Sequence, residues 1–294
     1  MKWDGQRESD NVEDRRDDGG SGGGGMPSFG GGRGIGLGGI VVALLASWAF
    51  GINPMTVLGL LGGGGEGAAP PAVTQNQGPK AQDPASRFVR VVLADTEDVW
   101  TAYFARAQQQ YAPPALVMFR GRTRTGCGTG EAAMGPFYCP PDRKVYIDLS
   151  FYDLLRDKLG APGDFAQAYV IAHEVGHHLQ NLMGTSAKMD SARERMSERE
   201  YKAMSVRLEL QADCYAGVWA HDSQKSKGWL EAGDIEEALN AASQIGDDTL
   251  QRKTQGTVVP ESFTHGSSAQ RVRWFKRGFE GGDLKGCDSF SGNV

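Results

Sequence analysis

Two histidines and a glutamate stand at the spacing of a hydrolytic zinc site. They are His173, Glu174 and His177, within the run AYVIAHEVGHHLQ at 168–180. Residues four apart lie above one another on a helix, so both histidines can bind one metal ion from the same face. Glu174 is then placed to act as the general base for an attacking water. His178 lies one step round the helix from His177, so we expect it to face away from the metal.

A catalytic zinc takes three protein ligands and keeps one position open, so a third ligand must come from elsewhere in the chain. Glu209 and Asp213 lie four apart in RLELQADCYAG at 207–217, and the apolar residues around them indicate a buried helix. We expect Glu209 to be the third ligand and Asp213 to accept a hydrogen bond from the outer nitrogen of a ligand histidine, fixing its tautomer. The alternative is a pair of solvated carboxylates.

Two further histidines lie outside the motif. His265 occurs in Thr-His-Gly-Ser-Ser, just before the last expected helix, and could stabilise the oxyanion of a peptide-hydrolysis intermediate. The alternative for His265 is a loop or helix-capping histidine. His221 closes a helix, where it would interact with the C-terminal dipole. We do not expect His221 to bind the metal.

The first quarter of the 294-residue chain differs in composition from the rest. Residues 1–34 are polar and then glycine-rich, which predicts a disordered tail because such a segment cannot bury a core. Residues 35–61 contain no charged residue and are long enough for one transmembrane helix, ending or kinking near 51–54. A cleaved signal peptide is disfavoured because the apolar stretch starts late and follows an acidic stretch. Residues 62–87 form a linker, and the folded domain is expected at 88–294.

Charge predicts the orientation of the chain. Five Lys or Arg residues precede the apolar stretch and only Lys80 follows it closely, which places the N-terminal tail in the cytoplasm. The domain at 88–294 would then lie outside the cytoplasmic or inner membrane, in the periplasm or the extracellular space. The net charge of -5 argues against nucleic acid as a partner.

Four cysteines could form disulfides in such an oxidising compartment. Cys127 and Cys139 bracket a glycine-containing loop, which suits a local disulfide, and Cys214 would then pair with Cys287. The rival interpretation makes Cys214 a metal ligand, because it follows Asp213. That interpretation is disfavoured because a fourth protein ligand would close off catalysis.

Hydrophobic periodicity predicts a mainly helical α+β fold with a small sheet. The strand 144–149 either forms an edge that binds extended substrate by strand addition or is an ordinary sheet strand. The expected elements are helices at 96–110, 163–183, 192–221, 234–244 and 268–279, with strands at 115–119 and 144–149.

Several blocks of the chain resemble the bacterial putative neutral zinc metallopeptidases, which are single-pass membrane proteins with an external domain. The blocks are HEVGHHLQN at 173–181, ELQADCYAGVW at 209–219, GPFYCP at 135–140, VYIDLSF at 145–151 and THGSSAQRV at 264–272. The H-E-x-G-H and E-x-x-x-D elements are also similar to the clan of CAAX endoproteases and heat-shock membrane proteases. That similarity implies a zincin-type peptidase with Glu209 as third ligand, and the clan has a Thr-His-Pro element at a place comparable to His265. Members of the clan span the membrane several times, so their intramembrane substrates are not carried over.

These observations lead to a membrane-anchored zinc endopeptidase that acts on a protein or peptide substrate. One Zn²⁺ would be bound by His173, His177 and Glu209, with Glu174 as general base. The alternative is a catalytically inactive zincin-fold binding or scaffold protein of the cell envelope, and a zinc hydrolase of non-peptide substrates is a third possibility. Glu174 favours an enzyme, because a purely structural metal site needs no general base.

Overall fold

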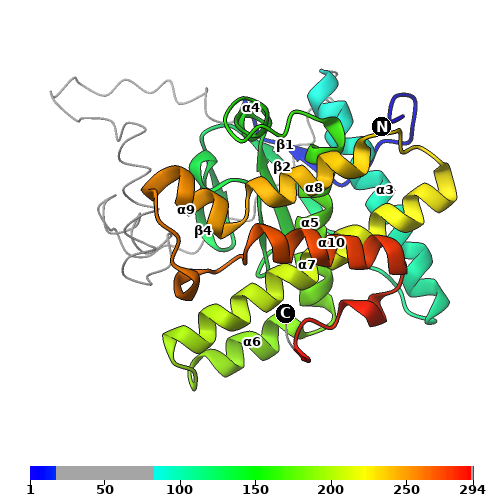
Figure 1. The fold of residues 1–294 in the computed structure, drawn as a ribbon. Helices are drawn as coiled ribbons and strands as arrows, with labels where there is room; N and C mark the ends of the chain where they lie inside the picture. Colours follow the sequence, from blue (N-terminus) through cyan, green and yellow to red (C-terminus); the bar gives the residue numbers. More distant parts are fainter. Residues whose placement is uncertain (18–82, 293) are drawn as a thin grey trace, which may run out of the picture.

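A small sheet and a group of helices form the folded part of the chain (Figure 1). The computed structural model describes residues 1–17, 83–292 and 294. Its strands are β1 (Val12–Asp14), β2 (Ala115–Phe119), β3 (Arg122–Thr125), β4 (Gly128–Glu131), β5 (Phe137–Cys139) and β6 (Lys144–Asp148). Its α-helices are α3 (Pro84–Arg106), α4 (Ser150–Asp157), α5 (Asp164–Leu182), α6 (Thr185–Arg193), α7 (Glu198–Lys227), α8 (Asp234–Gln244), α9 (Asp247–Gln255) and α10 (Ser268–Gly281). Short 3₁₀ helices occur at Ala132–Met134, Pro260–Ser262 and Leu284–Cys287.

The main sheet has the strand order β1-β2-β6-β5, with β1, β2 and β6 parallel and β5 antiparallel to β6. β3 and β4 form a separate antiparallel hairpin. Side chains alternate across the sheet, so Leu116 and Ile147 join the main helical core, whereas Val117 and Tyr146 belong to a small second cluster. The fold is therefore a mainly helical α+β arrangement with a small mixed sheet.

Several expected elements are present with nearly the expected bounds. β2, β6, α5, α8 and α10 correspond to the strands and helices expected at 115–119, 144–149, 163–183, 234–244 and 268–279. The helix expected at 192–221 differs, because α6 and α7 are separate. Ser197 and Glu200 form a capping box at the N-terminus of α7, so α7 begins as a separate helix. Each of the two side chains accepts a hydrogen bond from the backbone N–H of the other residue.

The strand at 144–149 is not an edge of the sheet. β6 pairs with β2 along Lys144–Asp148 on one side and with β5 at Lys144–Tyr146 on the other, so it is an interior strand. The edge-strand interpretation of this segment is therefore wrong.

The expected disorder of residues 1–34 is wrong for residues 1–17. β1 lies within this segment and pairs in parallel with β2, in the register Val12 to Leu116. Three residues of sequence Val-Glu-Asp have almost no hydrophobic pattern, so only pairing with the existing sheet defines this strand. The folded domain thus includes residues 1–17 and resumes at Asp83, which caps α3, rather than beginning at residue 88.

The apolar stretch 35–61 and most of the linker at 62–87 lie outside the described residues. Within the part of the chain that the structure describes, none of the helices has the length and apolar character needed to cross a membrane.

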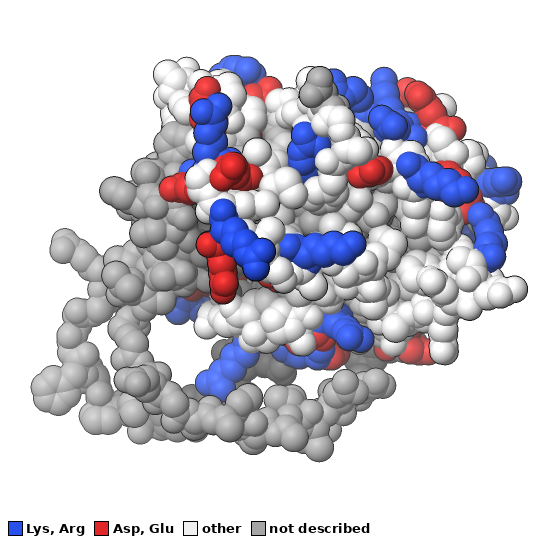
Figure 2. Space-filling view, turned by 90° about the horizontal axis from the view of Figure 1, so that it is seen from below, with Lys and Arg blue, Asp and Glu red and all other residues white. Residues whose placement is uncertain are grey.

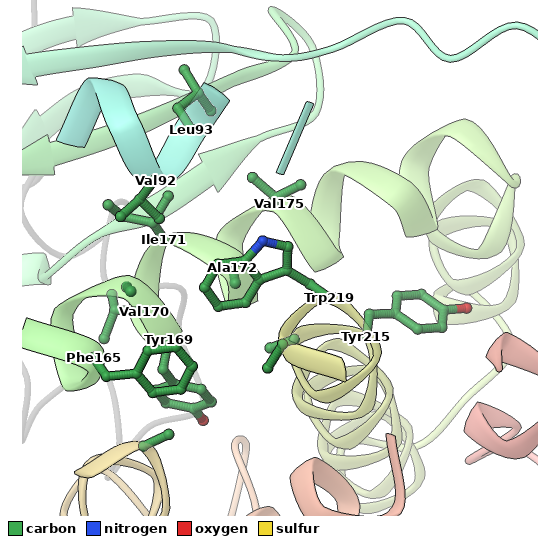
Figure 3. Packing of buried hydrophobic residues seen from close by; sticks show 14 of the residues in the cluster. Val92, Leu93, Phe165, Tyr169, Val170, Ile171, Ala172, Val175, Tyr215 and Trp219 are labelled. Atoms are coloured by element: carbon green, nitrogen blue, oxygen red, sulfur yellow. The ribbon is translucent and has the colours of Figure 1, made fainter. Parts of the chain in front are cut away.

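The core is built where α3, α5 and α7 meet (Figure 3). Trp219 of α7 is fully buried beside Ala172 and Val175 of α5, and its ring stacks on that of Phe165 at 5.7 Å between centroids. The indole N–H of Trp219 donates to a carboxylate oxygen of Asp95 in α3 at 2.7 Å. The motif helix α5 is therefore fixed by apolar packing between the sheet and α7.

Glycine allows α7 and α10 to cross in direct backbone contact. A Cβ atom at Gly278 would overlap the carbonyl oxygen of Cys214, and one at Gly217 would overlap the carbonyl oxygen of Phe275. The disulfide Cys214–Cys287 joins α7 to the 3₁₀ helix that follows α10. This close crossing sets the position of α10 relative to the middle of α7.

The crossing predicts a position-specific effect of alanine. Gly278→Ala should lower the free energy of unfolding by about 3 kcal/mol, because the methyl group forces two helix backbones apart. Gly281→Ala is the matched control in the same helix, because a Cβ there meets nothing within 4 Å. Urea unfolding of both variants measures the difference, and equal stabilities would contradict the close crossing.

Candidate metal centre

The structure brings His173, His177 and Glu209 together. One potential ligand atom from each lies within 4.8 Å of those of the others. The two histidines come from α5 and the glutamate from α7, so the packing of these helices creates the group. All three side chains are largely buried, with exposed fractions of 8%, 16% and 14%. The carboxylate of Glu209 thus lies beside the two histidines, and Cys214 is engaged in a disulfide instead.

The separations within this group are compatible with one shared zinc ion. Nε2 of His173 lies 3.1 Å from Oε2 of Glu209, and Nε2 of His177 lies 3.4 Å from Oε1. Two ligand atoms held at a tetrahedral angle about 2.0–2.1 Å from zinc lie roughly 3.3–3.4 Å apart. Two imidazoles and one carboxylate also make the ligand set of a catalytic zinc with an open fourth position.

Each ligand histidine is oriented by an acceptor at its other nitrogen. Nδ1 of His173 donates to Asp213 at 2.8 Å, and Nδ1 of His177 donates to the side-chain oxygen of Gln180 at 2.9 Å. The amide group of Gln180 in turn donates to the carbonyl oxygen of Leu208 at 2.7 Å. Both Nε2 atoms are therefore directed toward Glu209, as metal binding requires.

The same proximity changes the protonation of the group. Burial alone lowers the pKa of His177, but the charge and hydrogen bond of Glu209, the charge of Glu174 and the hydrogen bond to Gln180 together outweigh burial, and the pKa rises to about 9. Burial alone raises the pKa of Glu209, but the adjacent imidazoles outweigh it and hold that pKa well below its ordinary value. A bound metal ion must therefore displace protons from the histidines.

Asp213 is the centre of a buried network. It is fully buried, and besides His173 it accepts a hydrogen bond from the hydroxyl of Tyr169 at 2.5 Å. Arg271 of α10 binds both carboxylate oxygens, with Nε and Nη2 each at 2.8 Å. Burial alone raises the pKa of Asp213, but Arg271 and His173 outweigh it and lower the pKa to about 2. Asp213 is therefore an ionised acceptor for His173.

Glu174 is buried next to the first histidine, with 7% of its surface exposed. It lies outside the three-residue group that could bind the metal.

His265 approaches the centre from the loop before α10. Its ring is half exposed, and Nδ1 lies 3.2 Å from Asp247 of α9. The second oxygen of Asp247 accepts the backbone N–H groups of Thr264, His265 and Gly266 at 2.7–3.0 Å. Partial burial lowers the pKa of His265, but the hydrogen bond to Asp247 and the charge of Glu209 outweigh it and raise the pKa. His265 is therefore within electrostatic range of the metal ligands.

The other two histidines have structural contacts. His178 donates from Nε2 to the carbonyl oxygen of Ala112 at 2.7 Å and accepts at Nδ1 from the hydroxyl of Tyr138 at 3.0 Å. His221 donates to the carbonyl oxygen of Phe279 at 2.7 Å, at the end of α10 rather than of its own helix. Neither belongs to the group formed by His173, His177 and Glu209.

A second group of acidic residues, Asp164, Asp234 and Glu237, also lies close enough to bind a cation. The α-amino group of Met1 lies 3.0 Å from Asp164 and 3.3 Å from Asp234. An ammonium group therefore already lies between two of these carboxylates, and we assign the group no metal.

Comparison with known proteins places the chain in a family. A family model described as "Putative neutral zinc metallopeptidase" matches residues 1–290. The chain belongs to this family. Uncharacterized protein YpfJ of Escherichia coli K12 is 52% identical over 300 residues, covering 100% of both chains. Uncharacterized protein Rv2575 of Mycobacterium tuberculosis H37Rv is 42% identical over 217 residues, covering 70% of this chain and 72% of the relative. The comparison with solved structures gave no match.

Sequence reasoning missed three residues that orient the site of this zinc metallopeptidase family member. Gln180 lies three residues after His177, so it shares the face of that ligand on α5. Arg271 lies three and four residues before Trp274 and Phe275, which places a charge on the apolar face of α10. Only Asp247 gave no usable signal, because an acidic residue in the first turn of a helix is ordinary.

Both expected disulfides, Cys127–Cys139 and Cys214–Cys287, are present. They indicate an extracytoplasmic domain, because disulfides persist in oxidising compartments.

Arg271 should control metal affinity through Asp213. Arg271→Lys keeps the charge but loses the two-pronged contact, so we expect zinc to bind about tenfold more weakly while the domain stays folded. Competition with a chromophoric chelator measures the affinity. Arg273→Lys, at an exposed position of the same helix, is the matched control. Equal affinities in the two variants would show that Arg271 only supports the fold.

His178 should make stability depend on pH. Burial lowers its pKa to about 4, against an ordinary value of 6.5, so the unfolded chain binds the proton more readily. The buried neutral ring contributes fully to the free energy of unfolding above pH 6.5. This contribution is lost as the pH falls toward 4. Between pH 7.5 and 4.5 the loss is about 2.5 kcal/mol.

Urea unfolding of the metal-free wild type and of His178→Gln tests this expectation by comparing how their free energies of unfolding change with pH. His178→Gln lacks the titrating ring, so its free energy of unfolding should fall less than that of the wild type over this pH range. Parallel pH profiles of the two proteins would contradict a neutral buried His178.

Proposed function

We propose that the protein is a zinc-dependent endopeptidase that acts outside the cytoplasm. The observation that carries this proposal is the pairing of a buried His-His-Glu group, close enough to hold one metal ion, with Glu174, the adjacent glutamate of the motif helix. Membership of the zinc metallopeptidase family supports the metal and the reaction class.

The residues divide the chemistry between them. His173, His177 and Glu209 hold the zinc ion, which when bound polarises a carbonyl group and lowers the pKa of water. Glu174 accepts the proton of the attacking water and passes it to the leaving amine. Asp213 and Gln180 keep the two imidazoles in the tautomer that leaves Nε2 for the metal.

His265 is the candidate oxyanion stabiliser. Asp247 engages Nδ1, which leaves Nε2 as the free ring nitrogen, and the raised pKa favours the form in which both nitrogens are donors. A donor at this place would stabilise negative charge on the carbonyl oxygen of a peptide under attack.

The partners follow from this chemistry. The substrate is a protein or peptide, and the apolar stretch 35–61 would hold the enzyme at a membrane. Nucleic acid stays disfavoured by the net charge of -5. On the face seen in Figure 2, Lys and Arg side chains are spread among Asp, Glu and uncharged residues.

Glu174→Gln separates catalysis from metal binding. The variant should retain one zinc per chain and lose peptide cleavage by at least about a hundredfold, because the amide cannot accept the proton. Zinc content and hydrolysis of a quenched-fluorescent peptide library provide the two measurements. A wild type that binds zinc but cleaves no peptide would support the scaffold alternative.

Glu209→Ala tests the ligand set. Loss of the third ligand should abolish stoichiometric zinc binding after dialysis. Glu198→Ala, at the exposed start of the same helix, should retain zinc and is the matched control. Retention of zinc by Glu209→Ala would remove Glu209 from the site.

A further inference from the structure

The N-terminal segment, residues 1–17, is built into the sheet. The backbone N–H of Leu116 donates to the carbonyl oxygen of Asn11 at 2.8 Å, and the N–H of Arg15 donates to that of Met118 at 2.8 Å. Val12 is 7% exposed and joins the main core. β1 therefore occupies the edge of β2 and adds apolar contacts to the interior.

The N-terminal segment also supplies partners for a buried carboxylate in α3. Glu97 is 8% exposed and accepts hydrogen bonds from Ser9 at 2.5 Å, Asn11 at 2.7 Å and Arg7 at 3.0 Å. A buried charge without such partners is strongly destabilising. The surface of α3 is thus built to be covered by this segment.

A buried cation lies under the same segment. Arg90 of α3 is 3% exposed, and its guanidinium lies 3.5 Å from the carbonyl oxygen of Ser9. Asp14 attracts it, although burial outweighs that attraction and lowers the pKa of Arg90. Moving the N-terminal segment away would leave Arg90 and Glu97 without these partners.

Pairing of β1 with β2 limits how the chain can meet a membrane. The charge pattern places the tail and the domain on opposite faces, which would separate β1 from β2 by a bilayer about 30 Å thick in its hydrocarbon core. Strand pairing requires the two backbones to lie about 5 Å apart. One molecule cannot satisfy both conditions.

We propose that residues 1–17 and the domain that resumes at residue 83 fold together on the same side of the membrane. The intervening chain, residues 18–82, then starts and ends on that side. The disulfides indicate that this side is extracytoplasmic, so the N-terminal segment is exported with the domain. The proposal replaces both the cytoplasmic placement of the N-terminal tail and the single membrane crossing expected at residues 35–61, and it is independent of whether the metal centre is catalytic.

Cysteine labelling tests the sidedness. Asp17→Cys and Lys188→Cys each place one thiol at an exposed position, in the N-terminal segment and in α6. The full chain is produced in a Gram-negative bacterium, and spheroplasts are treated with a membrane-impermeant maleimide before or after lysis. We expect both thiols to react before lysis.

The other labelling outcomes are informative. Reaction of Lys188→Cys alone before lysis would overturn the proposal, because it places the two segments on opposite sides. Protection of both thiols until lysis would support a common side and overturn the extracytoplasmic location.

Thermal unfolding of the purified full chain tests the docking itself. Val12→Asp should lower the Tm by at least about 5 °C, because it buries a carboxylate without partners. Val259→Asp makes the same substitution at a valine that is 38% exposed, and it should shift the Tm little. Equal Tm values for the two variants would show that β1 is not docked and would overturn the proposal.

Discussion

The contact between Asp213 and Arg271 is the interaction on which the metal centre depends. A fully buried carboxylate is costly unless its charge is compensated and its oxygens accept hydrogen bonds. Arg271 meets both needs by binding the two oxygens of Asp213 at 2.8 Å, and Tyr169 and His173 complete the set of donors. The network joins α5, α7 and α10, so the orientation of a metal ligand is coupled to the packing of three helices.

Close helix packing and a disulfide position the helices that carry this network. Gly217 and Gly278 let the backbones of α7 and α10 touch, so the second half of α10 crosses the middle of α7. The disulfide at Cys214, adjacent to Asp213, ties α7 to the chain that follows α10. The glycines and the disulfide thus fix the positions of α7 and α10. The hydrogen bonds of Asp213 then orient the ligand His173.

The N-terminal segment shows how a fold can constrain cellular topology. Composition predicts that residues 1–34 form a disordered tail before an apolar stretch, and charge bias alone assigns that tail to the cytoplasm. Pairing of β1 with β2, and the contacts to Glu97, make residues 1–17 part of the domain instead. A rule based on local charge does not consider contacts between segments more than 70 residues apart, and here such contacts decide the placement.

The sequence by itself determined the elements and residues whose signals are local. The H-E-x-x-H spacing identified His173 and His177, the E-x-x-x-D spacing identified Glu209 and Asp213, and periodicity located helices such as α5 and α8. Tertiary structure alone decided the rest. β1 and β5 are three-residue strands that exist because a neighbouring strand offers hydrogen bonds, so no pattern in their own residues could predict them. Arg271 and Asp247 lie on helices far along the chain from the H-E-x-x-H motif. Their roles depend on the partners that folding places beside them, and tertiary structure alone decides those partners.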